Sequence, residues 1–199
     1  MVSRVSWVTL TQALQANTIS RDDVWQMFFD SASRTFPRGK IIVGVGVVFV
    51  SLENYVLPRA FSLMELCSNN VAKYNALLIG LQLAQQMGVQ YLEAYGNSKF
   101  IVNQVKGQHE VHHEDLIPYH HATINLADSF DGFYISHVSR LMNTKADALA
   151  MLAAILALLA HTTYSLTVAT RHLFCLKYGL GVIEIYTTLT NFEPKDWQF

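Results

Sequence analysis

The segment from Ser68 to Ala84 constrains the fold of this chain more than any other. It opens with three small polar residues, whose side chains can accept hydrogen bonds from the unpaired backbone N–H groups at a helix start. The apolar residues that follow at helical spacing are Tyr74, Leu77, Leu78, Leu81 and Ala84. One flank of this helix is therefore expected to pack on a sheet, and Gly88 is expected to end the helix.

Runs of β-forming residues lie on both sides of this helix in the sequence. The strand-like runs before and after it are residues 24–29, 41–50, 55–63 and 89–95. The run 41–50 is nearly all β-branched or glycine, which is typical of a strand buried on both faces. Gly44 and Gly46 inside it indicate a bulge or the close approach of another backbone.

Helices and one more strand are predicted in the second half of the chain. The predicted elements are a short helix ending at Val105, a helix over 116–130, a strand over 133–138 and a last helix over 143–161. The last helix contains a dense apolar stretch, residues 148–160, which at thirteen residues is too short to cross a bilayer. We therefore expect a buried or partner-covered helix and no membrane span.

Composition excludes several classes of protein. Of the 199 residues, 51% are hydrophobic and 15% are charged, so the chain is not disordered throughout. The formal net charge of −1 gives no global indication of a nucleic-acid-binding surface. Cys67 and Cys175 show no motif spacing, which favours a reduced intracellular setting.

The N-terminal residues 1–23 are predicted to be a leader. They contain no acid before Asp22, are rich in serine and threonine, and carry Arg4 and Arg21, as in an organelle presequence. The alternative is a disordered or loosely docked leader. We expect an intracellular, cytoplasmic protein, with the mitochondrion as the alternative compartment.

Four motifs in the remaining sequence resemble those of the ribonuclease H family. Residues 28–33 are similar to the pattern F-x-D-G-A-S, and residues 96–98 are similar to G-D-S. Residues 70–77 resemble N-x-A-E-Y-x-A-L, and residues 137–150 follow H-V-x-R-x-x-N-x-x-A-D-x-L-A throughout. The resemblance covers about residues 25–159 and implies an α/β fold, a five-stranded mixed sheet with helices on both faces.

The chain resembles in particular the ribonuclease H segment of plant long-terminal-repeat retrotransposon polyproteins of the Ty3/gypsy type. This resemblance implies a ribonuclease H-like domain over residues 24–161. Residues 162–199 form a tail of unassigned structure, and residues 192–197 look like the polyprotein linker that leads towards integrase. We therefore expect a stand-alone remnant of a mobile element.

In that family four carboxylates hold two divalent ions, which activate the attacking water and stabilise the leaving oxygen. The resemblance implies that Asp30 and Asp147 are the retained catalytic carboxylates. The other two positions hold Lys73 in place of glutamate and Asn97 in place of aspartate. The family-like neighbours of the site are His137 and Asn143.

Lys73 and Asn97 together reduce four negative charges to a net charge of −1 at the four positions, and Lys73 is the decisive change because it introduces a positive charge. Its ammonium would repel a divalent ion by about 8 kcal/mol at about 4 Å, with an effective dielectric constant of about 20. Asn97 alone would be tolerated, because an amide oxygen can still bind a metal. We expect no metal cofactor, and we expect Lys73 to pair with Asp30 and Asp147 instead.

A histidine cluster offers a second candidate site. His109, His112, His113, His120 and His121 lie close together in the sequence, and imidazoles bind zinc. Because no cysteine lies among them and the spacing fits no structural zinc pattern, a solvated loop is the preferred interpretation.

These observations leave two hypotheses of function. The first is a catalytically impaired domain that binds a protein partner or associates with itself through residues 143–199, with weak or absent binding to RNA–DNA hybrids. The alternative is a Mg²⁺-dependent ribonuclease H that cleaves the RNA strand of such hybrids. The residue at position 73 favours the first hypothesis.

Overall fold

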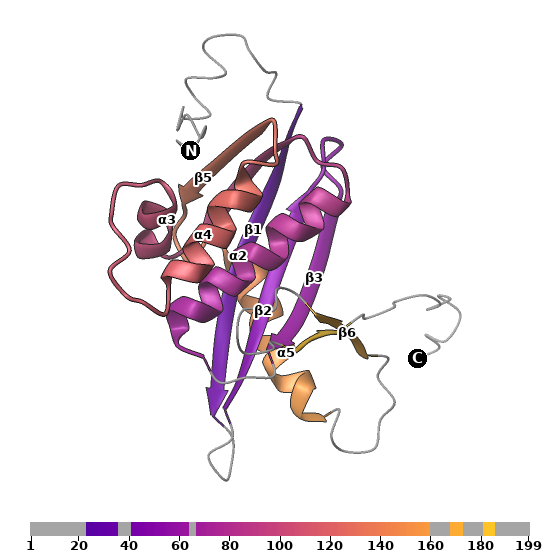
Figure 1. Ribbon diagram of the computed structural model, residues 1–199. Helices are drawn as coiled ribbons and strands as arrows, with labels where there is room; N and C mark the ends of the chain where they lie inside the picture. The colour runs from indigo at the N-terminus through magenta and orange to yellow at the C-terminus, as the bar shows by residue number, and fades with distance from the viewer. Residues whose placement is uncertain (1–22, 36–40, 64–66, 160–167, 173–180, 186–199) are drawn as a thin grey trace, which may run out of the picture.

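The computed structural model describes residues 23–35, 41–63, 67–159, 168–172 and 181–185 (Figure 1). The strands are β1 (Val24–Thr35), β2 (Ile41–Val50), β3 (Val56–Leu63), β4 (Tyr91–Gly96), β5 (Gly132–His137), β6 (Val168–His172) and β7 (Gly181–Ile185). The helices are α2 (Asn69–Gln86), α3 (Lys99–Val105), α4 (Ile117–Ala127) and α5 (Thr144–Leu159). Residues 1–22 of the expected leader and the linker-like residues 192–197 lie outside the described residues.

The strands form one mixed sheet in the order β5-β4-β1-β2-β3-β7-β6. Neighbouring strands from β1 to β3 are antiparallel, whereas β1 pairs with β4, and β4 with β5, in parallel. The predicted five-stranded mixed sheet is therefore confirmed. The strands β6 and β7 extend this sheet, because β7 pairs with β3 in antiparallel. The sequence alone predicted no structure for either strand.

Helices cover both faces of the sheet, as predicted. Figure 1 shows α2 and α4 crossing one face, and α5 packs against β1, β2 and β3 from the other. The core between the sheet and α2 contains Tyr74, Leu77 and Leu81, all buried. In the part of the chain that the structure describes, no helix combines the length and hydropathy that a membrane crossing requires.

The organising helix α2 begins and ends close to its predicted limits. The hydroxyl of Ser68 accepts a hydrogen bond from the Val71 backbone nitrogen at 3.3 Å, which caps the helix start. After the last turn, Gly88 takes a φ of 75°, a left-handed conformation that glycine adopts at little cost.

The first strand is longer than the sequence indicated. Its polar second half, residues 31–35, pairs in antiparallel register with residues 41–45 of β2. Because the backbone of β2 supplies this pairing, the strand continues although its side chains are no longer apolar. Asp30 therefore lies within the strand, opposite Gly46, and not at the strand end where the sequence placed it.

Gly44 and Gly46 let α5 approach β2 closely, as their positions in a buried strand indicated. A Cβ atom at Gly46 would lie 2.6 Å from the Ala150 nitrogen and would also overlap the Ala146 carbonyl oxygen. A Cβ atom at Gly44 would meet the α5 backbone in the same way. The two glycines therefore set the distance between the helix and the sheet.

Substituting Gly46→Ala is expected to lower the free energy of unfolding by about 2–3 kcal/mol, because α5 must move away from β2 as a unit. Urea denaturation measures this loss. The control is Gly132→Ala, where the new Cβ atom would meet the side chain of Tyr91 at 2.8 Å, and a ring can turn aside. Equal losses in the two variants would contradict the close approach of α5.

Candidate functional site

Four predicted site residues meet where β1, β4, α2 and α5 come together. The parallel pairing of β1 with β4 places Phe29 opposite Gly96, so that Asn97, directly after β4, lies beside Asp30. The start of helix α2 carries Lys73 to the same point. Asn143, directly before α5, reaches Asp30 from the other side of β1.

The Asp30 carboxylate is the centre of this cluster and is 2% exposed. One oxygen, Oδ1, accepts hydrogen bonds from Lys73 Nζ and from the Ser31 backbone nitrogen, both at 2.8 Å. The other oxygen, Oδ2, accepts from Asn97 Nδ2 at 2.6 Å and from Asn143 Nδ2 at 3.5 Å. Four protein donors, one of them cationic, therefore surround a single buried carboxylate.

Lys73 closes a ring of polar contacts. Its ammonium, 22% exposed, donates to Asn97 Oδ1 at 3.0 Å as well as to Asp30. The Asn97 side chain thus turns its oxygen towards the lysine and its nitrogen towards the aspartate. Each side chain of the ring contacts the other two, which holds the ammonium in one place.

The predicted pairing of Lys73 with Asp30 is confirmed, but its predicted pairing with Asp147 is wrong. Asp147 lies in the first turn of α5 and accepts from Arg140 Nη2 at 3.0 and 3.3 Å. Arg140 belongs to the loop directly before α5, so it reaches this carboxylate locally. The positive end of the helix dipole also favours a carboxylate in this turn. Arg140 lies within the motif of residues 137–150, but the sequence alone predicted no role for it.

Asn143 and His137, the family-like neighbours, take different positions. Asn143 is buried and donates to the Phe29 carbonyl oxygen at 3.0 Å, so it ties the start of α5 to β1. Its own Oδ1 is buried without a hydrogen-bond partner. His137 is exposed at the end of β5, where its backbone pairs with Gly96.

The donor set of this cluster does not fit a divalent cation. Both oxygens of Asp30 already accept hydrogen bonds from nitrogen donors, and Lys73 places a positive charge 2.8 Å from one of them. Among the residues that the structure describes, no three His, Cys, Asp or Glu side chains converge as metal ligands. The same statement covers the histidine cluster, so that the zinc alternative gains no support.

The histidines nevertheless share a feature of the surface. His109, His112, His120 and His121 line a depression of about 430 Å³ between α3 and α4, whereas His113 is not part of its lining. The solvated loop expected from the sequence is therefore a concave site. Sequence spacing could not reveal this, because the depression forms only when α4 packs beside α3.

The strand order β5-β4-β1-β2-β3, with α2 and α5 on opposite faces and a polar cluster around Asp30 where β1 meets β4, defines a ribonuclease H-like domain. Comparison of the sequence with protein-family models agrees with this class. The chain belongs to the reverse transcriptase-like family, whose model matches residues 42–153.

Curated relatives match part of their own length. Ribonuclease HI of Halobacterium salinarum is 32% identical over 123 residues, which is 62% of this chain and 60% of that protein. A bifunctional protein of Mycobacterium tuberculosis is 33% identical over 104 residues, which is 52% of this chain and 29% of that protein. The chain therefore spans less than two thirds of either relative.

Two solved structures of ribonucleases H match this chain over nearly the whole of their own length. Ribonuclease H1 from Halobacterium salinarum is 31% identical with a TM-score of 0.60, over 65% of this chain and 96% of that chain. LC11 ribonuclease H1, solved in complex with an RNA/DNA hybrid and isolated from compost by metagenomics, is 26% identical with a TM-score of 0.59. That match covers 67% of this chain and 99% of the other.

Substituting Lys73→Met removes the ammonium from Asp30 and keeps a side chain of similar length. We expect the free energy of unfolding to fall by about 3 kcal/mol, because a buried carboxylate would lose its counter-charge. The double variant Lys73→Met with Asp30→Asn should recover most of this loss, because it leaves no unpaired charge. Urea denaturation of these two variants and of the single variant Asp30→Asn gives the coupling energy.

Arg140→Ala is the control for these Lys73 and Asp30 variants, since it breaks an exposed ion pair near the same site. Its cost should stay below about 1 kcal/mol. If Lys73→Met unfolds at the same urea concentration as the unchanged protein, the ammonium is not the counter-charge of Asp30.

Proposed function

We propose that this chain is a ribonuclease H-like domain that has lost hydrolytic activity and acts as an interaction module. The observation that carries the proposal is the contact between Lys73 and Asp30. The Lys73 ammonium and three further donors already form hydrogen bonds with the Asp30 carboxylate, which would have to bind the metal ions. A divalent ion would have to displace the lysine before it could reach Asp30.

Electrostatics support the proposal. An ion at about 4 Å from the ammonium would meet a repulsion of about 8 kcal/mol with an effective dielectric constant of about 20. Asp147 is 22% exposed and is paired with Arg140, and a single carboxylate is a weak ligand set for Mg²⁺. We infer that binding to RNA–DNA hybrids is weak and falls steeply with salt, since only phosphate contacts would hold it.

We further propose an origin in a plant retrotransposon of the Ty3/gypsy type. The resemblance of about residues 25–159 to the ribonuclease H segment of those polyproteins supports this origin, and so does membership of the reverse transcriptase-like family. In this proposal the domain acts inside the cell, in the cytoplasm, with the mitochondrion as the alternative.

The surface around α5 supports an interaction role. Leu152 and Ile155 are exposed on α5, and Leu141 and Met142 are 84% and 70% exposed in the loop before it. Exposed apolar side chains on neighbouring elements are typical of a surface that another protein covers. We propose that residues 143–199 contribute to self-association or to the binding of a protein partner.

Substituting Leu152→Glu together with Ile155→Glu places two charges on one face of α5, one helical turn apart. If this face mediates self-association, the dissociation constant should rise about tenfold or more. Sedimentation velocity over a range of concentrations measures it. Met87→Glu, an exposed apolar position at the end of α2, is the control and should change nothing. A chain that is monomeric at every concentration would rule out self-association.

The second candidate function is a metal-dependent ribonuclease H. The similarity to ribonuclease HI of Halobacterium salinarum, together with the hybrid bound to LC11 ribonuclease H1, favours this activity. The retained Asp30 and Asp147 are consistent with it. The contacts of Lys73 oppose it, because the ammonium would have to leave Asp30 during each catalytic cycle.

A cleavage assay separates the two functions. We expect no cleavage of an RNA–DNA hybrid above background in Mg²⁺ or Mn²⁺, and a melting temperature that does not change with Mg²⁺, because a ligand stabilises only the state that binds it. The variant Lys73→Glu with Asn97→Asp restores four carboxylates. It should be less stable than the unchanged protein without metal and should gain stability with Mg²⁺.

The variant Asp147→Asn tests the opposite outcome. A melting temperature of the unchanged protein that rises with Mg²⁺, and no longer rises in Asp147→Asn, would mean that metal binds despite Lys73. Cleavage that disappears in Asp30→Asn would establish the enzyme and end the proposal of an inactive domain.

A further inference from the structure

The parallel strands β1, β4 and β5 carry a set of side chains that take no part in the proposed function. Side chains alternate between the two faces of a strand, and Met27, Leu92 and Phe133 are buried in the core with α2. On the opposite face α5 packs against β1, β2 and β3. The side chains that lie beside α5 on this face, which we call the open face, are those of Gln26, Phe28, Tyr91, Glu93, Tyr95 and Tyr134.

Most of the open face is aromatic, and its rings are only partly buried. Phe28 and Tyr95 stack with their ring centroids 4.8 Å apart. A Cβ atom added at Gly132 would meet ring atoms of both Tyr91 and Tyr134, so these two rings also lie close together. Partly exposed aromatic side chains on three adjacent strands form an apolar surface of the kind that another segment covers.

A buried carboxylate lies at the centre of the open face. Glu93 is in register with Gln26 on one side and with Tyr134 on the other, and it is 8% exposed. In the described part of the chain, its carboxylate forms neither an ion pair nor a hydrogen bond that would compensate its burial. Burial raises the pKa of Tyr134, and the neighbouring Tyr91 and Glu93 raise it further. Because buried charges are normally paired, a cation is the group that this face lacks.

The charges around the open face favour a basic occupant. Asp23, Asp128 and Asp131 flank the starts of β1 and β5, and all three are exposed. The phosphates of a nucleic acid would meet these carboxylates and Glu93, which opposes binding of a nucleic acid here. A second copy of the chain would bring two Glu93 carboxylates to one interface, because a two-fold contact joins the same surfaces. The occupant is therefore expected to be both basic and apolar.

Residues 1–22, which lie outside the described residues, have this chemistry. Arg4 is their only charged side chain before position 21. Trp7, Leu10 and Leu14 recur at the i, i+3 and i+7 spacing that groups side chains on one side of a helix. Arg4 precedes Trp7 by three residues, so the same spacing groups the guanidinium with these apolar side chains.

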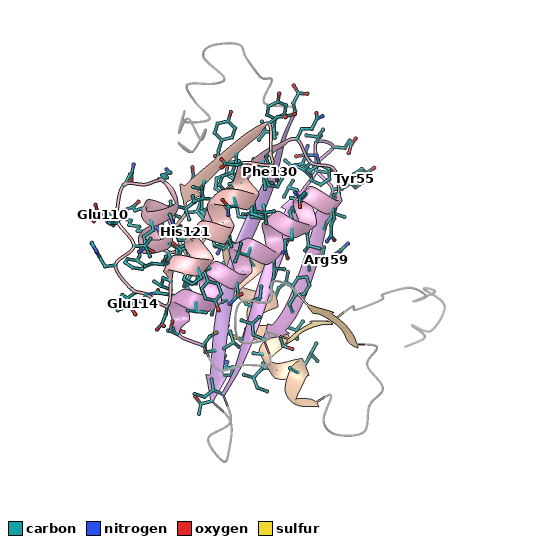
Figure 2. The ribbon with its side chains drawn as sticks, viewed as in Figure 1. Tyr55, Arg59, Glu110, Glu114, His121 and Phe130 are labelled. Atoms are coloured by element: carbon teal, nitrogen blue, oxygen red, sulfur yellow. The ribbon has the colours of Figure 1, made fainter. Side chains whose placement is uncertain are left out.

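This segment is attached where it can reach the open face. It leads into Val24, whose neighbour on β4 is Tyr91. Figure 2 shows Tyr55 and Phe130 at the end of the molecule where β1 begins. Residues 15–23 can span about 30 Å, whereas three neighbouring strands measure about 10 Å across. A tethered segment also acts at a high effective concentration, so modest contacts are enough to hold it in place.

We propose that residues 1–22 fold back over the open face and that the Arg4 guanidinium pairs with the Glu93 carboxylate. The three large apolar side chains of the segment then cover the tyrosines and remove their rings from water. A guanidinium also packs well on aromatic rings, so the surroundings of Glu93 suit it. The depression of about 220 Å³ between Phe28 and the start of α5 gives a large apolar side chain further room. In this arrangement the leader is part of the folded domain.

Hydroxyl-radical footprinting of the full chain, followed by mass spectrometry, measures how strongly each tyrosine is shielded. Substituting Leu10→Ser together with Leu14→Ser should raise the labelling of Tyr91 and Tyr134 severalfold, because their cover is lost. The labelling of Tyr55, which is 68% exposed directly before β3, should stay unchanged.

The matched control is Val5→Ser together with Val8→Ser. These changes have the same chemistry in the same segment, but residues two positions before and one position after Trp7 do not share its side of a helix. Both tyrosines should therefore stay shielded in this control.

The ion pair is tested with arginine variants. Arg4→Gln should raise the labelling of Tyr134, whereas Arg21→Gln should not. In the Glu93→Gln background, Arg4→Gln should have no further effect, because the partner of the guanidinium is already gone. Tyr74 is fully buried and stays unlabelled while the domain is folded, so unfolding of a variant would be recognised.

Several outcomes would overturn the proposal. Unchanged tyrosine labelling in the leucine variant would mean that residues 1–22 do not cover the open face, and so would equal increases in the leucine and valine variants. An increase at Tyr55 alone would place the segment at the hairpin. Shielding that grows with protein concentration would mean that a second copy covers the face. An effect of Arg21→Gln in place of Arg4→Gln would overturn the pairing with Glu93. None of these readouts depends on hybrid cleavage or on the surface around α5.

Discussion

The contact between the Lys73 ammonium and the Asp30 carboxylate governs the chemistry of this domain. A carboxylate that is 2% exposed needs a counter-charge and hydrogen-bond donors, because burial alone would make its ionised form costly. A resident lysine and three nitrogen donors meet that need within the chain itself. The charge and the acceptor capacity of the carboxylate are therefore met by groups of the chain, and under the proposed function its contribution is one of structure.

The sheet explains why these groups meet at all. Parallel pairing of β1 with β4 sets Asn97 beside Asp30, and the start of α2 brings Lys73 to the same carboxylate. Gly44 and Gly46 let the backbone of α5 approach β2, which brings Asn143 onto β1. Two glycines that take no part in catalysis therefore help to place one of the hydrogen-bond donors of Asp30.

The sequence predicted the elements and the members of the site better than their contacts. The capped helix with Tyr74 on its buried flank and the strand 41–50 have strong local signals, so both are found where expected. Asp147 pairs with Arg140 because the two side chains lie close in space, and β1 is long because the backbone of β2 pairs with it. Hydrophobic periodicity in the sequence predicts neither contact. The strands β6 and β7 are short and gain their pairing from β3, so their residues alone gave no clear signal.

Lys73 and Asn97 fit each other. The Asn97 amide donates to Asp30 at 2.6 Å and accepts from Lys73, which no carboxylate can do, because an ionised carboxylate has no proton to donate. An aspartate at position 97 would place a second carboxylate beside that of Asp30, and its negative oxygen would stand where Asn97 now donates. The Lys73 ammonium would be the one cation shared by the two carboxylates. A glutamate at position 73 would remove the cation and leave Asn97 to donate alone. Changing either position by itself therefore disturbs the ring, and Lys73 and Asn97 act as a single unit.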